Sequence, residues 1–243
     1  MGKLYVVGLG PGGQQYMSEK ARAAVSEADV VIGYTTYIAL VRDLFPEKEY
    51  VQTPMRTERE RCLQAIERAG KGQCVALVCS GDAGIYGMAG LVLELLSDVA
   101  ADVEVEIVPG ITAAVMAAAV LGAPLMNDFC IISLSDLLTP ADVIRRRLSA
   151  AAAGDFVICL YNPRSHTRTK PLDEALTILR SVLSPLTVVG IVRNAGRDGQ
   201  RCWIGTLEKV EPEKVDMFCV MIIGNSATRV LNERMVTARG YFG

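Results

Sequence analysis

Apolar runs typical of buried strands alternate with helix-like segments along the chain, and this alternation constrains the fold more than any other feature. In the first half, strands are expected at residues 4–7, 30–32, 74–79 and 103–108. The segments between them carry apolar residues at helical spacing. The strand runs are almost continuously apolar, which is typical of a mainly parallel sheet covered by helices on both faces.

A break at residues 122–124 (GAP) separates this series from a second one. Further strands are expected at residues 129–134, 156–161, 187–192, 202–206 and 217–223. The last two are joined by a segment too short and polar for a crossover helix, so the second sheet is expected to be mixed. We therefore predict an α/β fold with two α/β domains, residues 1–122 and 123–243, and an interdomain cleft.

Composition excludes several classes of protein. Apolar residues make up 51% of 243 residues, charged residues 21%, and the formal net charge is −2. This balance indicates a globular protein without the basic footprint of a nucleic-acid-binding protein. The longest apolar stretch, residues 111–126, is shorter than the ~20 residues that a membrane span requires. The seven cysteines form no CxxC pair, so we expect reduced thiols in a cytoplasmic protein and no metal site.

The most informative local feature is the glycine-rich stretch CSGDAGIYGM, residues 79–88, which directly follows an expected buried strand. Open α/β sheets bind ligands at the carboxyl ends of their strands. Asp82 contributes a carboxylate, which suits hydroxyl or ammonium groups and suits phosphate poorly. We therefore expect a small polar cofactor without a phosphate in this loop.

A second glycine-rich stretch, residues 8–13 (GLGPGG), matches the dinucleotide-binding pattern GxGxxG. Two details count against a nicotinamide or flavin site. The second strand runs into Gly33 and Tyr34 instead of an acidic residue that would bind a ribose, and Pro11 removes an amide from the turn. The alternative interpretation is a tight turn at the mouth of the cleft.

Taken together, VGLGPG (7–12), SGD (80–82) and VPGITA (108–113) resemble, in order and spacing, the tetrapyrrole methylase family, over the whole chain. Further stretches resemble the branch that methylates C17 of precorrin-3B in cobalamin biosynthesis: GYTTY (33–37), SLSDLLTP (133–140), YNPRS (161–165), GNS (224–226) and MVTARGY (235–241). Ala83 and Ala238 stand where the family usually has proline.

The resemblance implies S-adenosylmethionine as the cofactor, with S-adenosylhomocysteine as its product. Carried over residue by residue, it implies these cofactor-binding residues: Pro11, Gly81, Asp82, Ile85, Thr112, Ala113, Tyr161, Asn162 and Ala195. Ile85 and Ala113 would equally suit core positions. Backbone groups of glycine loops and a hydroxyl can satisfy the polar groups of such a ligand.

The implied substrate is a tetrapyrrole with several carboxylates, which arginine pairs through parallel hydrogen bonds. Candidate substrate-binding residues are Gly10, Arg56, Arg164, His166 and Arg193; His166 also fits an exposed polar position. The branch also contracts the ring: a C20 hydroxyl loses its proton, a ring bond migrates and C20 leaves the macrocycle as an acetyl substituent. Candidate catalytic residues are Asp136, Ser133 and Ser135, with Tyr34 and Tyr37 orienting the ring. Asp136 could instead cap a helix.

Three classes of function remain open at this point. The first is a precorrin-3B C17-methyltransferase, with the anaerobic counterpart acting on cobalt-precorrin-3, or another precorrin C-methyltransferase, as close variants. The second is a nicotinamide-dependent oxidoreductase, and the third a tetrapyrrole-binding module without chemistry. The resemblance also implies a homodimer with a small-molecule substrate, and we expect no nucleic-acid or membrane partner.

Overall fold

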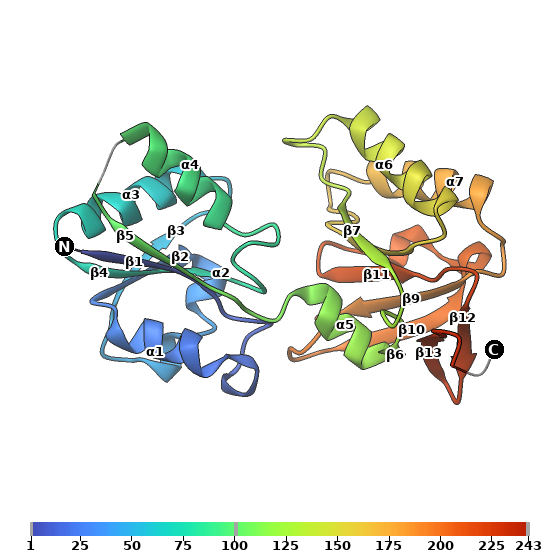
Figure 1. Ribbon diagram of the computed structural model, residues 1–243, viewed down its shortest axis with the longest axis horizontal. Coiled ribbons are helices and arrows are strands. Elements are labelled where there is room, and N and C mark those ends of the chain that lie inside the picture. The colour runs from blue at the N-terminus through green and yellow to red at the C-terminus, as the bar shows by residue number, and fades with distance from the viewer. Residues whose placement is uncertain (1, 100–101, 242–243) are drawn as a thin grey trace. The chain divides into compact units, whose positions relative to one another are not determined.

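The computed structural model describes residues 2–99 and 102–241, which form two compact units (Figure 1). The first unit ends at Ala113 and the second begins at Ala114. The sequence predicts this division one helix later, at residues 122 and 123. The helix in question, α5 (Ala113–Leu121), belongs to the second unit because Leu121 packs against Gly190 of the second sheet.

The first unit contains a five-stranded sheet in which every paired strand is parallel, in the order β3-β2-β4-β1-β5. Its strands are β1 (Lys3–Gly8), β2 (Val30–Tyr34), β3 (Glu49–Thr53), β4 (Cys74–Cys79) and β5 (Glu104–Val108). Four of them match expected strands. The edge strand β3 was missed because its residues are mostly exposed or half-buried, so its sequence EYVQT contains no apolar run.

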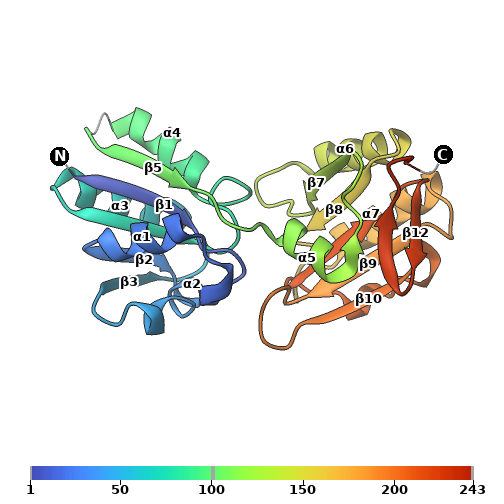
Figure 2. The same cartoon turned by 60° about the horizontal axis from the view of Figure 1, so that its bottom comes forward.

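Helices cover both faces of this sheet, as predicted (Figures 1 and 2). They are α1 (Glu19–Glu27) and α2 (Thr35–Ile38) on one face, and α3 (Glu58–Gly70) and α4 (Ala89–Val99) on the other. Alternate residues of β1 enter the two cores: Val7 packs with the cluster that includes α1, and Val6 packs with the cluster that includes α3 and α4.

The segment between β2 and β3 forms the short helix α2 and a 3₁₀ turn (Arg42–Leu44), and no long helix. The hydroxyl of Tyr50 donates to the carbonyl of Phe45 at 2.8 Å. A side chain from β3 therefore satisfies a carbonyl where the chain does not continue as a helix.

The second unit contains a five-stranded mixed sheet in the order β10-β9-β11-β8-β7. Its strands are β7 (Phe129–Ser133), β8 (Val157–Tyr161), β9 (Val188–Arg193), β10 (Arg201–Thr206) and β11 (Cys219–Ile223). β7 and β8 are parallel, whereas β11 runs antiparallel to both β8 and β9, and β10 antiparallel to β9. The mixed sheet predicted from the short final connection is confirmed.

Helices α6 (Ala141–Ala153) and α7 (Lys170–Val182) cover one face of this sheet, and α5 lies on the other (Figures 1 and 2). A small three-stranded sheet joins β12 (Thr228–Leu231), β13 (Arg234–Thr237) and β6 (Gly122–Ala123). The two-residue turn between β12 and β13 has Asn232 and Glu233 at positive φ, 46° and 62°. Such a turn matches the twist of a hairpin.

Candidate functional site

Three loops of the first unit meet at the carboxyl edge of its sheet because β1, β4 and β5 are parallel neighbours. The loops after β1 and β4 are joined by a reciprocal pair of backbone hydrogen bonds. The Gly10 amide donates to the Gly81 carbonyl at 3.0 Å, and the Gly81 amide donates to the Gly10 carbonyl at 2.7 Å. Both residues have positive φ, 70° and 72°, which glycine adopts without steric cost.

The turn after β5 packs against the same two loops so closely that there is no room for a side chain. A Cβ atom added to Gly110 would lie 2.2 Å from the Gly81 carbonyl oxygen and 2.6 Å from the Gly8 carbonyl carbon. These are backbone atoms, which cannot move aside as the tip of a side chain could. Gly8, Gly81 and Gly110 thus form one backbone-lined surface, called here the glycine cradle.

Asp82 joins the loops of the glycine cradle through its carboxylate. Its Oδ1 accepts from the amides of Gly84 at 2.8 Å and Ile85 at 3.0 Å, and its Oδ2 accepts from the amide of Gly110 at 2.9 Å. The sequence predicted a carboxylate for hydroxyl or ammonium groups of a ligand. In the structure this carboxylate binds three backbone amides, so it shapes both the β4 loop and the β5 turn.

The residues around the glycine cradle fit a polar ligand without a phosphate. The segments 9–13, 80–88 and 109–113 contain no lysine or arginine, which phosphate sites commonly use. They offer backbone groups, Thr112, which is 7% exposed, and Ile85, which is 39% exposed. Pro11 is buried and Ala113 is half-buried. S-adenosylmethionine has an adenine, ribose hydroxyls, an ammonium and a carboxylate, and this set of groups suits it.

The thiol that precedes the β4 loop is buried and poorly suited to act as a nucleophile. Cys79 is 2% exposed, and burial raises the pKa of its thiol to about 11. Burial likewise raises the pKa of Cys62 and Cys159 to about 12. At neutral pH these thiols are protonated, and a protonated thiol is a poor nucleophile.

A second polar cluster lies at the carboxyl ends of the parallel strands β7 and β8, within the second unit. The Asn162 side chain donates to Ser133 Oγ at 2.9 Å, and the Ser135 amide donates to the same oxygen at 3.2 Å. The Tyr161 hydroxyl accepts from the Ala114 amide in the first turn of α5 at 2.5 Å. The structure thus brings together Ser133, Ser135, Tyr161 and Asn162, which the sequence predicted separately as catalytic or cofactor-binding residues.

Asp136 belongs to this second cluster through Arg168. Its Oδ1 lies 3.9 Å from Arg168 Nε, and its side chain is 38% exposed. Helix α6 begins after Pro140, and no side-chain hydrogen bond caps that terminus. Asp136 therefore does not cap α6.

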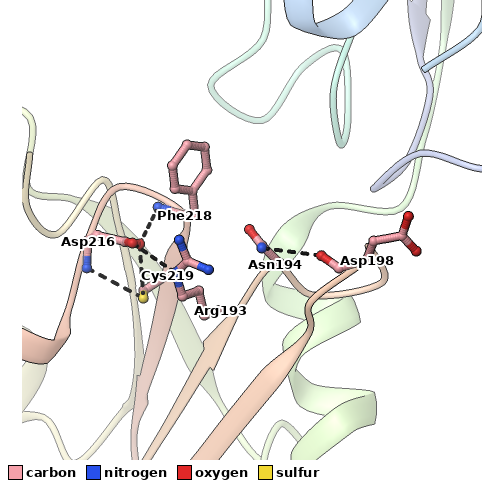
Figure 3. Close-up of polar contacts among 6 residues, drawn as sticks. All are labelled: Arg193, Asn194, Asp198, Asp216, Phe218 and Cys219. Atoms are coloured by element: carbon pink, nitrogen blue, oxygen red, sulfur yellow. Dashed lines mark hydrogen bonds and ion pairs between the residues drawn. The ribbon is translucent and has the colours of Figure 1, made fainter. Parts of the chain in front are cut away.

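Arg193, predicted to bind substrate, has partners within its own unit (Figure 3). Its Nε donates to Asp216 Oδ2 at 2.8 Å, and its guanidinium lies 5.6 Å from the centre of the Phe218 ring. Asp216 Oδ1 also accepts from the Phe218 amide at 2.9 Å. The adjacent Asn194 has a positive φ of 52° and donates to the Asp198 carbonyl at 3.3 Å. This turn positions Ala195, which is half-buried.

The other predicted substrate and orienting residues lie in three segments: Arg56 precedes α3, Arg164 and His166 lie between β8 and α7, and Tyr34 and Tyr37 lie at the end of β2 and in α2. Arg56 is exposed with a positive φ of 68°. Arg164 lies 3.9 Å from Asp173, and His166 is exposed. Tyr34 and Tyr37 make an edge-to-face ring contact with centroids 5.2 Å apart. The tyrosine pair is therefore held in one orientation at the end of β2.

One polar residue of the first unit escaped the sequence analysis. Arg61 in α3 is 2% exposed; its Nε donates to Thr53 Oγ1 at 2.5 Å and its Nη2 to the Pro54 carbonyl at 2.9 Å. Its Nη1 lies 3.4 Å from the sulfur of Met88, at the end of the β4 loop. Its burial could have been predicted from the sequence, because Arg61 lies next to Cys62 and one helical turn before Ala65, on the buried face of α3.

Comparison with known proteins decides between the open classes. Residues 3–211 match the family of Tetrapyrrole (Corrin/Porphyrin) Methylases. The chain belongs to this family. It is 51% identical to a probable cobalt-factor III C(17)-methyltransferase of Salmonella typhimurium, over 98% of this chain and 99% of the relative. It is 40% identical to a precorrin-3B C(17)-methyltransferase of Sinorhizobium sp, over 100% of this chain and 98% of the relative.

Solved structures agree with the tetrapyrrole methylase fold. The crystal structure of the methyltransferase CobJ superimposes with a TM-score of 0.93 at 37% identity, covering 98% of this chain and all of the other. A uroporphyrin-III C-methyl transferase from Thermus thermophilus, complexed with S-adenosylhomocysteine, has a TM-score of 0.67 at 23% identity and covers 92% of this chain and 97% of the other. At that identity, the second likeness concerns the fold.

The described residues show neither a membrane-spanning helix nor a metal-binding cluster. In the parts of the chain that the structure describes, none of the helices combines the length and apolar composition that crossing a bilayer requires. Residues 2–99 and 102–241 contain no group of three or more His, Cys, Asp or Glu side chains placed to hold a metal ion.

The glycine cradle predicts a large cost for adding one methyl group at Gly110. Gly110→Ala forces the Gly81 carbonyl and the Gly8 backbone apart, and overpacking of this kind typically costs ~1–3 kcal/mol. Urea unfolding measures the loss of stability. The matched control is Gly90→Ala in α4, where nothing lies within 4 Å of the added Cβ. That change should stabilise the helix by ~0.5–1 kcal/mol. Equal stability of the two variants would contradict the close approach.

The Arg193–Asp216 pair predicts a specific acid sensitivity. Burial by itself raises the pKa of Asp216, but the hydrogen bonds from Arg193 and from the Phe218 amide outweigh it and hold the pKa below its usual range. A carboxylate with a lowered folded-state pKa contributes stability above its unfolded pKa and loses it as pH falls through the folded pKa.

The wild type should therefore lose more unfolding free energy than Asp216→Asn between about pH 5 and pH 2. Urea unfolding at a series of pH values measures this difference. If the unfolding free energies of the two proteins fall by the same amount over this pH range, Asp216 is not held ionised by its partners.

Proposed function

We propose that this protein transfers a methyl group from S-adenosylmethionine to C17 of a precorrin-3-type tetrapyrrole and contracts the ring, as a step of cobalamin biosynthesis. The observation that carries the proposal is the glycine cradle, which offers a backbone surface without phosphate-binding cations beside the motifs of a tetrapyrrole methylase. When bound, S-adenosylmethionine supplies an electrophilic methyl group and leaves as S-adenosylhomocysteine.

The cobalt-bearing ring is the proposed substrate, in preference to the metal-free one. The sequence left both forms open. The cobalt-factor III relative is 51% identical to this chain and the precorrin-3B relative 40% identical, over nearly the full length in each case. The metal arrives in this proposal as part of the substrate, so the protein needs no metal ligands of its own.

The proposed cofactor contacts in the first unit are those around the glycine cradle: Pro11, Gly81, Asp82, Ile85, Thr112 and Ala113. In the second unit they are Tyr161, Asn162 and Ala195. Positioning is the main task of the protein in methyl transfer, because correct orientation alone can supply ~7–11 kcal/mol. The short glycine contacts support this role, since a backbone surface packed to this degree has little freedom to shift.

Asp136 is the proposed general base for ring contraction, with Ser133 and Ser135 beside it. A general base must be held within hydrogen-bonding reach of the proton it removes, which is that of the C20 hydroxyl in a ring that carries one. The partly exposed carboxylate of Asp136, at the end of β7, supports this role. Tyr34 and Tyr37 are proposed to orient the macrocycle. Arg56, Arg164, His166, Arg193 and Gly10 remain the proposed substrate contacts, and for Arg193 a substrate carboxylate would share the guanidinium with Asp216.

A nicotinamide-dependent oxidoreductase is not supported. The second strand of a dinucleotide-binding unit ends near an acidic residue that binds ribose, and β2 ends at Tyr34, followed by α2 from Thr35. We also propose that the protein works in the cytoplasm as a homodimer. Its seven cysteines are all unpaired, which supports a reducing compartment.

The proposal predicts methylation of cobalt-factor III in the presence of S-adenosylmethionine. Mass spectrometry should find one added methyl group on the macrocycle, and the absorbance should change as the conjugated ring contracts. S-adenosylhomocysteine should form in equal amount. Turnover of precorrin-3B alone would overturn the preference for the cobalt-bearing ring, and turnover of neither compound would overturn the proposed reaction.

A binding control separates the classes of protein without any tetrapyrrole. A ligand that binds the folded state alone raises thermal stability by mass action. S-adenosylhomocysteine should therefore raise the melting temperature, whereas NAD should leave it unchanged.

A further inference from the structure

The side chain of Arg168 connects the two loops that follow β7 and β8. Its Nη1 donates to the Leu134 carbonyl at 2.7 Å, and its Nη2 donates to the Asn162 carbonyl at 2.8 Å. Its Nε lies 3.9 Å from Asp136 Oδ1. One guanidinium thus contacts a backbone carbonyl in each of the two loops of the second polar cluster. It also lies near the carboxylate of Asp136, the proposed base.

Arg168 is itself held in place at its backbone. The Ser165 amide donates to the Arg168 carbonyl at 3.0 Å, and the Arg168 amide donates to the Ser165 carbonyl at 3.3 Å, which closes a small loop. Helix α7 begins two residues later, at Lys170. The guanidinium therefore projects from a fixed base, and its side chain is only 17% exposed.

The loop that Arg168 holds has little apolar burial of its own. Leu137 is 66% exposed and Leu138 is 98% exposed, so residues 135–139 contribute little to the core. Polar anchors hold the segment instead: Ser133 Oγ accepts the Ser135 amide at 3.2 Å, and Arg168 contacts Leu134 and Asp136. Without the guanidinium, Asp136 would lose its contact with Arg168, and the segment would keep the Ser133–Ser135 contact and the anchor at Leu134, which is buried and whose amide donates to the Tyr161 carbonyl at 2.9 Å.

These contacts assign Arg168 a role different from that of a cation for substrate carboxylates. A guanidinium presents five N–H donors in a rigid fork, and in Arg168 this fork spans two carbonyls from different loops. Arg164, in the same segment, has a long ion pair with Asp173 at 3.9 Å and bridges no carbonyls in the hydrogen bonds of the described residues. Arg164 therefore keeps its guanidinium available for an anion, and Arg168 uses its own to join the loops.

We propose that Arg168 is a positioning residue, which fixes Asp136 and Asn162 relative to each other and so sets the efficiency of ring contraction after methyl transfer. This inference rests on the proposed function. Asn162 also binds Ser133 Oγ, so a change at Arg168 reaches Asp136, Asn162 and Ser133 together.

The test compares Arg168→Lys and Arg168→Gln with two reference variants. Asp136→Asn keeps the shape of the proposed base without its basicity. Arg180→Gln is the matched structural control, because Arg180 also joins backbone carbonyls of this unit, with Nη2 donating to Leu207 at 3.2 Å and to Val210 at 3.1 Å. Each purified variant is assayed for KM, kcat and the ratio of contracted to methylated, uncontracted product. Thermal unfolding confirms that each is folded.

Both Arg168 variants should lower kcat for the contracted product by roughly 10- to 100-fold, since small misplacements cost this much. KM should stay within about threefold, and methylated, uncontracted ring should accumulate as in Asp136→Asn. Arg168→Lys should not restore kcat for the contracted product, because an ammonium group cannot bridge two carbonyls as the guanidinium does. Arg180→Gln should lower the melting temperature and leave the product ratio unchanged.

Two results would overturn the inference. Rescue by lysine, with a raised KM in the glutamine variant, would make Arg168 a substrate-binding cation. A product ratio unchanged from wild type in both Arg168 variants would make it a structural residue like Arg180. Failure of the wild type to methylate any tetrapyrrole would instead refute the proposed function, so the two failures are distinguishable.

Discussion

The first unit depends on the contact between the backbones of Gly8, Gly81 and Gly110. Three parallel strands deliver their loops to one edge of the sheet, and those loops can meet only because no Cβ lies between them. Asp82 then fixes the arrangement by accepting amides from both the β4 loop and the β5 turn. The result is a polar surface built from backbone, which suits the proposed cofactor through its shape and directed hydrogen bonds instead of charge.

In the second unit, side chains hold the loops at the edge of the sheet together. The parallel neighbours β7 and β8 deliver the loops that hold Ser133 and Asn162 to one edge of the mixed sheet, where β9, which is also antiparallel to β11, ends as well. Those loops are joined by a guanidinium where the first unit uses glycine backbone contacts. This division suits the proposed reaction, in which methyl transfer is followed by ring contraction. Methyl transfer needs a rigidly placed cofactor, and ring contraction needs a titratable group held at a set position.

Much of this architecture follows from sequence pattern because buried parallel strands leave continuous apolar runs. The pattern failed for β3, whose residues are mostly exposed or half-buried, and for the β12–β13 hairpin, whose four-residue strands alternate polar and apolar residues or are largely exposed. It located Asp82 at a strand end, yet the amide of Gly110 that binds Asp82 is 28 residues away and is found only in the folded chain. Nothing in the sequence distinguishes Arg168 from the other arginines, and its two carbonyl partners are found only in the folded chain.

The central claim is that Asp82 shapes a cofactor site, and calorimetry of S-adenosylhomocysteine binding to Asp82→Ala tests it most directly. Removing the carboxylate leaves amides of the β4 loop and the β5 turn without their acceptor, at a cost of ~1–3 kcal/mol. If that cost falls on binding, affinity should drop about 5- to 150-fold. The matched control is Asp98→Ala, on the exposed surface of α4, which should bind like the wild type. Unchanged affinity in a folded Asp82→Ala protein would contradict the account.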